Sequence, residues 1–128
     1  MEFYLPTSTG EWLACASATV TILFGLTLLV APYRALHILR LKIHPDHPQA
    51  IAQARATLAG FYLGVGITAI LFAQPFLWLA LGAGWGFTAF GRLISILVDR
   101  GFATHNGVLI VVELVLASLP LAYVFGYT

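Results

Sequence analysis

Two residues of opposite charge, Arg92 and Glu113, lie inside long apolar stretches of the chain. An unpaired charge in such a place costs roughly 2.5–3.5 kcal/mol even on the mild membrane-insertion scale. A short polar segment, Asp99 to Gly107, separates the two stretches, with Arg92 seven residues before it and Glu113 six residues after it. At about 1.5 Å per helical residue, both charges lie ~9–10 Å from the same membrane face. We therefore expect a buried ion pair between two neighbouring antiparallel helices.

Other polar residues recur at helical spacing around these two charges. Thr88, Arg92, Ser95 and Asp99 share one helical face, and Arg55 and Tyr62 share a face of the preceding apolar stretch. These faces are expected to converge on one polar pocket, formed by Arg55, Tyr62, Thr88, Arg92, Ser95, Asp99 and Glu113. Ionisable groups inside a membrane are functional candidates by default. Three interpretations stay open: a structural clamp, a site for an anionic ligand or lipid headgroup, and proton-coupled chemistry.

Four histidines raise the question of a metal or haem. A haem within a helical bundle needs imidazoles that face each other in the interior, and all four histidines fall in or beside polar connecting segments. The only candidates for a metal site are weak ones: His44, Asp46, His47 and His105. Their spacing matches no recognised ligand motif, so we expect neither a metal nor another cofactor.

Motifs of enzymes and of nucleic-acid binding are also missing from the sequence. There is no G-x-S-x-G elbow, no P-loop and no dinucleotide fingerprint. The basic residues are few and have no aromatic platform between them, which speaks against a nucleic-acid partner. The sequence therefore favours a protein that is not an enzyme.

The composition sets the class of fold that must position these residues. The chain of 128 residues is 60% hydrophobic and 9% charged, against about 25% charged in a typical soluble domain. Four apolar stretches are long enough, or nearly so, to cross a bilayer: Trp12–Ala31, Ala56–Ala73, Phe76–Val98 and Val108–Phe125. We predict an all-α integral membrane protein, a bundle of four transmembrane helices that forms a single domain over residues 1–128.

The charges outside the spans predict the topology. With four spans, the segments 32–55 and 99–107 lie on one side of the membrane, and both termini lie on the other. The first side carries five basic residues, Arg34, Arg40, Lys42, Arg55 and Arg100, whereas the second carries only Glu2 and Glu11. By the positive-inside rule the two loops are cytoplasmic and both termini face outside.

The longer cytoplasmic segment has an amphipathic part. From Tyr33 to Ile43, basic residues recur three apart and apolar residues occupy another face. This pattern predicts a short cytoplasmic interfacial helix that lies on the anionic inner leaflet.

Small residues line one face of each of the first three spans. Close backbone contact drives the association of helices in lipid, and small side chains permit it. The expected packing positions are Ser17, Thr21, Gly25, Gly60, Gly64, Gly82, Gly86 and Gly91. They fit packing within the bundle or a seam between copies. In the fourth span, Pro120 should leave the carbonyl of Leu116 without its helical donor.

Part of the sequence resembles a known family. The resemblance lies in the run R-A-T-L-A-G-F-Y-L-G-V-G from Arg55, in G-R-L-I-S from Gly91, in D-R-G from Asp99, and in Glu113. These motifs are similar to a family of small four-span bacterial membrane proteins catalogued only as a domain of unknown function. The resemblance implies a four-helix bundle in the bacterial cytoplasmic (inner) membrane, with Arg55, Arg92 and Glu113 as family features. It implies no activity.

Three functional hypotheses follow. The leading one is a non-enzymatic accessory or structural subunit, which joins other membrane subunits or associates with itself in the lipid bilayer. The second is a small oligomeric transporter in which Glu113 is the coupling carboxylate. The third is a protein that binds or modifies a lipid or an anionic ligand in the cytoplasmic-side polar pocket.

Overall fold

The computed structural model describes residues 8–39, 41, 46, 50–98 and 104–126, and over these residues the fold is helical without strands. Four helices are long and apolar enough to cross a membrane, which confirms the predicted all-α four-helix membrane fold. The helical elements are α1 (Thr9–Val30), α2 (Pro32–Ile38), α3 (Ala50–Gln53), the π-helical turn η1 (Ala54–Leu58), α4 (Ala59–Phe72), α5 (Pro75–Val98) and α6 (Thr104–Val124). The elements α3, η1 and α4 follow one another without a break and together make the second span.

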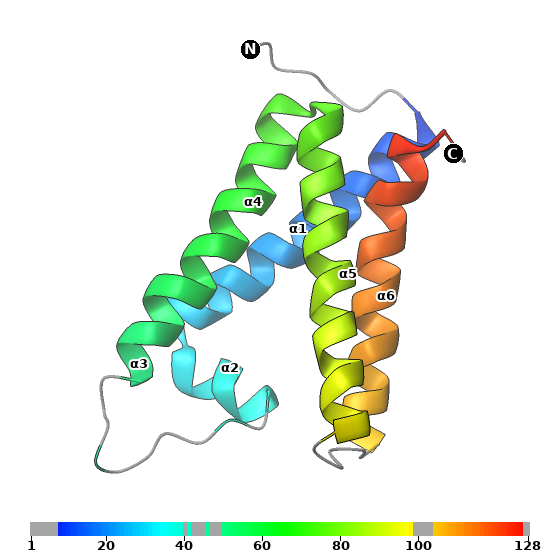
Figure 1. Cartoon of the computed structure of the whole chain (residues 1–128). Coiled ribbons are helices and arrows are strands. Elements are labelled where there is room, and N and C mark those ends of the chain that lie inside the picture. The colour runs from blue at the N-terminus through cyan, green and yellow to red at the C-terminus, as the bar shows by residue number, and fades with distance from the viewer. Residues whose placement is uncertain (1–7, 40, 42–45, 47–49, 99–103, 127–128) are drawn as a thin grey trace.

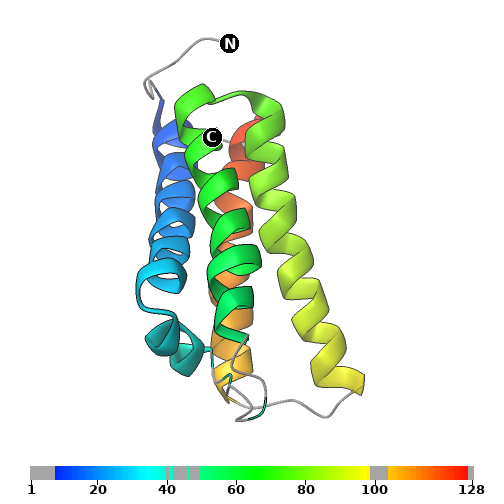
Figure 2. The same cartoon turned by 90° about the vertical axis from the view of Figure 1, so that its left-hand side faces the viewer.

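The four long helices form two closely packed pairs. Helix α1 packs along α4, and α5 packs along α6, while α1 also contacts α6. Helices α4 and α5 meet at their shared turn and diverge from there, as both views show (Figures 1 and 2). The start of α1 and the end of α6 lie at the same end of the bundle as this turn, and α2 lies at the opposite end (Figure 1). The divergence leaves one side of the bundle open.

Local capping explains where α1 begins and ends. The Ser8 hydroxyl accepts a hydrogen bond from the backbone N–H of Glu11 at 3.2 Å, so the helix starts at Thr9 rather than at the expected Trp12. At the other end, Ala31 leaves the helical conformation, and Pro32 becomes the first residue of α2. Proline suits that position because its missing N–H has no helical partner there.

The segment expected to be helical from Tyr33 to Ile43 is helical only as far as Ile38. The N–H of Leu41 bonds back to the carbonyl of Leu36 at 2.8 Å, a bond from outside the helix that satisfies one of its last carbonyls. The predicted amphipathic pattern holds within α2, where Arg34 and His37 are exposed and Leu36 is buried. Leu36 packs against α1 and the second span, so α2 is attached to the bundle. Residues 42–43 lie outside the described part of the chain.

The turn between α4 and α5 has a special backbone conformation. Ala73 ends α4 with a φ of 47°, in the left-handed region. Its N–H still bonds to the carbonyl of Ala69, and the Gln74 carbonyl accepts from the N–H groups of Leu77 and Trp78 at the start of α5. Pro75 begins α5, which fixes φ at the first helical position. This short turn sets the angle at which α4 and α5 diverge.

Glycines allow the close approach of helices at three points within the chain. A β-carbon on Gly25 would lie 2.9 Å from Leu63, one on Gly66 would lie 3.1 Å from the Ala18 carbonyl, and one on Gly82 would lie 3.1 Å from the Ala117 carbonyl. Of the positions expected to mediate packing, Ser17, Thr21, Gly25 and Gly82 are buried. Four others do not mediate packing within the chain, because a β-carbon there would meet no atom within 4 Å: Gly60, Gly64, Gly86 and Gly91.

Candidate functional site

The expected ion pair between Arg92 and Glu113 is present and has ideal geometry. The Nε of Arg92 donates to Oε1 of Glu113 at 2.9 Å, and its Nη2 donates to Oε2 at 2.8 Å. The third nitrogen, Nη1, donates to Oδ1 of Asn106 at 3.0 Å. The side chain of Glu113 is 6% exposed and that of Arg92 is 23% exposed. The predicted pairing is therefore confirmed as a two-pronged, largely buried salt bridge.

The antiparallel packing of α5 and α6 brings these three side chains together. Asn106 and Glu113 lie seven residues apart on α6, which places them two turns apart on one face. The face of α5 that carries Arg92 packs against that face. The same spacing of seven residues was visible in the sequence, yet Asn106 was not among the expected site residues. Its amide oxygen accepts a hydrogen bond from the guanidinium without adding a charge.

Four of the expected site residues line one cavity. Its volume is about 290 Å³, and its polar lining consists of Tyr62, Thr88, Arg92 and Glu113. The rest of the lining is apolar or aromatic: Val20, Phe24, Ile38, Leu39, Leu41, Leu58, Trp85, Leu109, Val112 and Leu116. All four spans and α2 thus contribute to a mostly apolar cavity with polar groups on its α4, α5 and α6 sides. The sequence suggested a pocket lined by polar residues, whereas most of the residues that line this cavity are apolar.

Two of the remaining expected site residues, Arg55 and Ser95, do not line this cavity. Arg55 is exposed and belongs to η1. A π-helical turn holds an extra residue, so it rotates the residues before it relative to those after it. The expectation that Arg55 and Tyr62 share a face assumed a regular α-helix, and η1 departs from that geometry. Asp99 lies outside the described residues.

The weak metal candidates fall mostly outside the described part of the chain. His44 and His47 lie outside the described residues, and nothing is described of the side chain of His105. Asp46 is exposed. Among the described residues, no three His, Cys, Asp or Glu side chains are grouped closely enough to hold a metal ion.

A buried chain of hydrogen bonds, which the sequence did not predict as a unit, connects three helices beside the cavity. The indole Nε1 of Trp85 donates to the Thr21 hydroxyl at 2.8 Å, and that hydroxyl donates to the Ser17 carbonyl at 2.9 Å. The Ser17 hydroxyl in turn donates to the carbonyl of Leu116 at 2.6 Å. This is the carbonyl that Pro120 was expected to leave without a helical donor. Ser17 and Thr21 thus supply hydrogen bonds as well as small size.

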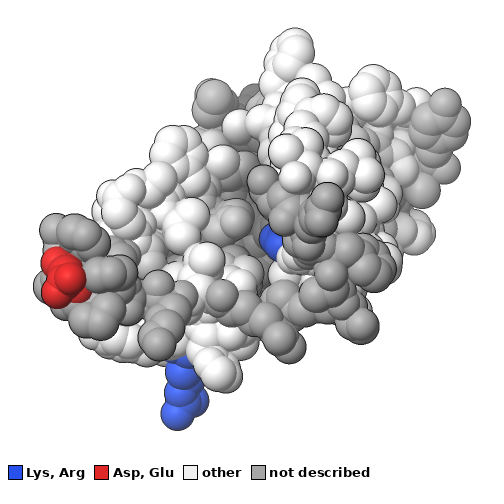
Figure 3. All heavy atoms as spheres, turned by 60° about the horizontal axis from the view of Figure 1, so that its bottom comes forward, with Lys and Arg blue, Asp and Glu red and all other residues white. Residues whose placement is uncertain are grey.

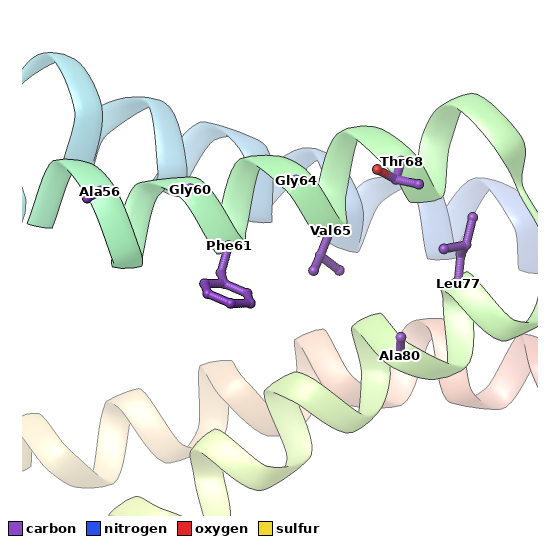
Figure 4. A pocket seen from close by; sticks show the side chains of 8 residues that line it. All are labelled: Ala56, Gly60, Phe61, Gly64, Val65, Thr68, Leu77 and Ala80. Atoms are coloured by element: carbon purple, nitrogen blue, oxygen red, sulfur yellow. The ribbon is translucent and has the colours of Figure 1, made fainter. Parts of the chain in front are cut away.

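A second hollow lies where α4 and α5 diverge. It has a volume of about 510 Å³, and one edge is formed by Ala56 of η1 and by Gly60, Gly64 and Thr68 of α4. Phe61 and Val65 of α4 point toward α5, while Leu77 and Ala80 of α5 point toward α4 (Figure 4). We call this hollow the α4–α5 groove. None of the described residues that line it carries a charge.

The four long apolar helices define a multi-pass α-helical membrane protein with four spans in a lipid bilayer. Residues 10–124 match the family described as Domain of unknown function (DUF4345), and the chain belongs to that family. No curated protein matches the chain, and no solved structure does either. The family description names no activity, so a function has to be inferred from the geometry.

Proposed function

We propose that the protein is a non-enzymatic structural subunit of the bacterial inner membrane, a single four-helix domain that associates with a second copy of itself along the α4–α5 groove. One observation carries this proposal. Gly25, Gly66 and Gly82 are all used for close helix contacts inside the chain, whereas a β-carbon on Gly60 or Gly64 would meet no atom within 4 Å. The same packing device is therefore present on α4 without a partner.

The spacing on α4 fits a symmetric contact between two helices. Gly60, Gly64 and Thr68 follow one another at intervals of four on α4, the small-xxx-small pattern through which transmembrane helices approach closely. A two-fold axis would place the same stripe of the second copy against it, so each copy supplies both halves of the contact. The absence of charge in the groove suits an interface that stays within the hydrocarbon.

The test measures association in a bilayer. Gly60→Leu should weaken self-association at least about tenfold, since loss of close packing by ~1.4 kcal/mol has that effect. Gly91→Leu is the matched control, because Gly91 is also an exposed helical glycine with no atom near its missing β-carbon and lies outside the groove. Energy transfer between labelled copies, measured over a range of protein densities in vesicles, gives the association constant of each variant.

Equal association of the two variants would contradict the proposal. A wild-type protein that stays monomeric at every density would also contradict it, and would point to a different protein in the groove. Leucine at either position meets no atom near the β-carbon, so the fold of one copy should be preserved in both variants.

The transporter hypothesis has less support in the geometry. Both carboxylate oxygens of Glu113 already accept hydrogen bonds from Arg92. A coupling carboxylate has to gain and lose a proton or cation during each cycle, and the bidentate guanidinium opposes that exchange.

A further inference from the structure

We propose that the cavity beside Arg92 and Glu113 binds an uncharged single-chain amphiphile, which places its polar head against the ion pair and its chain between α1 and α6. Among the described residues, this cavity shares no lining residue with the α4–α5 groove, although a hollow of about 190 Å³ borders on both. The inference therefore does not depend on self-association.

The cavity is small and mostly apolar. A volume of about 290 Å³ equals the space of roughly ten water molecules in the liquid, but apolar cavities hold water poorly. Most of the lining is aliphatic or aromatic, and a few polar groups in an apolar hollow are typical of ligand sites. The volume suits a small head with the first part of one chain. It is too small for the headgroup and two chains of a phospholipid.

The cavity is accessible from the surface of the bundle. Val20, Ile38 and Val112 line the cavity and are also exposed on the surface of the molecule. They belong to α1, α2 and α6, so the cavity opens between these helices, at the end of the bundle where α2 lies (Figure 1). Figure 3 looks onto that end, where most of the described surface is uncharged and one patch of basic atoms lies recessed in a hollow. A lipid-soluble molecule can enter sideways from the bilayer.

The paired charges beside the cavity exclude an anionic head. The guanidinium and the carboxylate neutralise each other, and Glu113 lies within 2.9 Å of Arg92. An anion placed beside Arg92 would also face the Glu113 carboxylate, in a medium of low dielectric constant. However, Nη1 and Nη2 of Arg92 use only one of their two hydrogens in the bonds described, since a guanidinium carries five donors. A hydroxyl or ester carbonyl can accept from them without bringing in a charge.

The experiment uses a monoacylglycerol with a photoreactive diazirine in its chain, added to the full-length protein in vesicles of phosphatidylethanolamine and phosphatidylglycerol. After illumination, mass spectrometry locates the labelled residues. We expect saturable labelling, several-fold stronger on the cavity residues Val112 and Leu116 than on Val111 and Val115, which are exposed on the same helix and do not line the cavity. Excess unlabelled monoacylglycerol should remove the difference.

Two adjacent valines provide a matched pair of variants. Val112→Phe should block the mouth of the cavity and abolish the saturable labelling, whereas Val111→Phe should leave it unchanged. If Val112→Phe fails to fold, the comparison within α6 of the wild-type protein still decides the question. Even labelling around α6, in proportion to the amount of probe, would overturn the proposal. Equal saturable labelling by the corresponding alkyl sulfate would show an anion site and overturn it as well.

Discussion

Arg92 satisfies its charge almost entirely within the chain, through Glu113 and Asn106. A buried ion pair adds little net stability, but removing one partner leaves the other charge uncompensated. The Arg92–Glu113 salt bridge is therefore best understood as a requirement that α5 and α6 pack in one register.

A double-mutant cycle tests this interpretation. Arg92→Leu and Glu113→Leu should each lower the free energy of unfolding by roughly 3 kcal/mol, near the lower bound for a broken buried pair because Arg92 is partly exposed. The double variant should lose less than the sum of the two, since it leaves no charge unpaired. Unfolding in mixed micelles by added sodium dodecyl sulfate measures the free energy of unfolding of all three variants. The control is Arg34→Leu at an exposed position, which should change that free energy by almost nothing. Strict additivity would mean that the two residues are not coupled.

The bond from Ser17 to the Leu116 carbonyl depends on Pro120, and that dependence can be measured. Ser17→Ala should destabilise the protein by about 1 kcal/mol, because it leaves the buried carbonyl without a donor. In a Pro120→Ala background, residue 120 regains an N–H that can donate to Leu116, so the same change should cost clearly less. Ser118→Ala, whose hydroxyl donates to a carbonyl of its own helix, should be almost neutral. An equal cost of Ser17→Ala in both backgrounds would refute the link.

At the scale of the helices, the glycines divide into those that hold the bundle together and those that do not. Gly66→Ala would place a β-carbon 2.6 Å from Cγ1 of Ile22 and should cost about 1–3 kcal/mol through overpacking. Gly64→Ala meets no atom within 4 Å and should stabilise the isolated bundle by up to about 1 kcal/mol through helix propensity. Melting temperatures of the two variants at low protein density distinguish them. A lower melting temperature for Gly64→Ala than for Gly66→Ala would show that the face of α4 with Gly64 is the one packed inside the bundle.

The helices and the salt bridge were predictable from the sequence for a simple physical reason. Apolar length sets the spans, and charges at matched depth on consecutive antiparallel helices are within reach of each other. The position of Arg55 was not predictable, because no residue spacing indicates the π-helical turn η1, whose Ala54 packs in one buried cluster with Leu28 of α1. The bond between Trp85 and Thr21 joins residues 64 apart, and no local pattern indicates such a contact. The cavity likewise arises from the angles between helices rather than from residue spacing.

For the whole molecule, the predicted membrane topology rests on which charged residues lie at each end of the bundle. The first turn of α1 and the end of α6 lie together, and the hydroxyl of Tyr123 donates to Glu11 there at 2.6 Å. Arg34 and Arg55 belong to α2 and η1, at the opposite end. We expect that end to face the cytoplasm. A reporter that is active only in the cytoplasm should give no signal when fused after Thr128, and a strong signal there would reverse the orientation.

The salt bridge between consecutive helices has a consequence for how the chain enters the membrane during synthesis. Helix α5 emerges from the ribosome before α6, so for a time the Arg92 guanidinium has no carboxylate to meet. Insertion as a hairpin, with α5 waiting at the translocon until α6 arrives, avoids exposing that charge to lipid. A nascent chain that stops before α6 should therefore insert α5 poorly, and Arg92→Leu should restore insertion, as glycosylation mapping in microsomes can show. Full insertion of the truncated wild-type chain would mean that α5 can insert without α6.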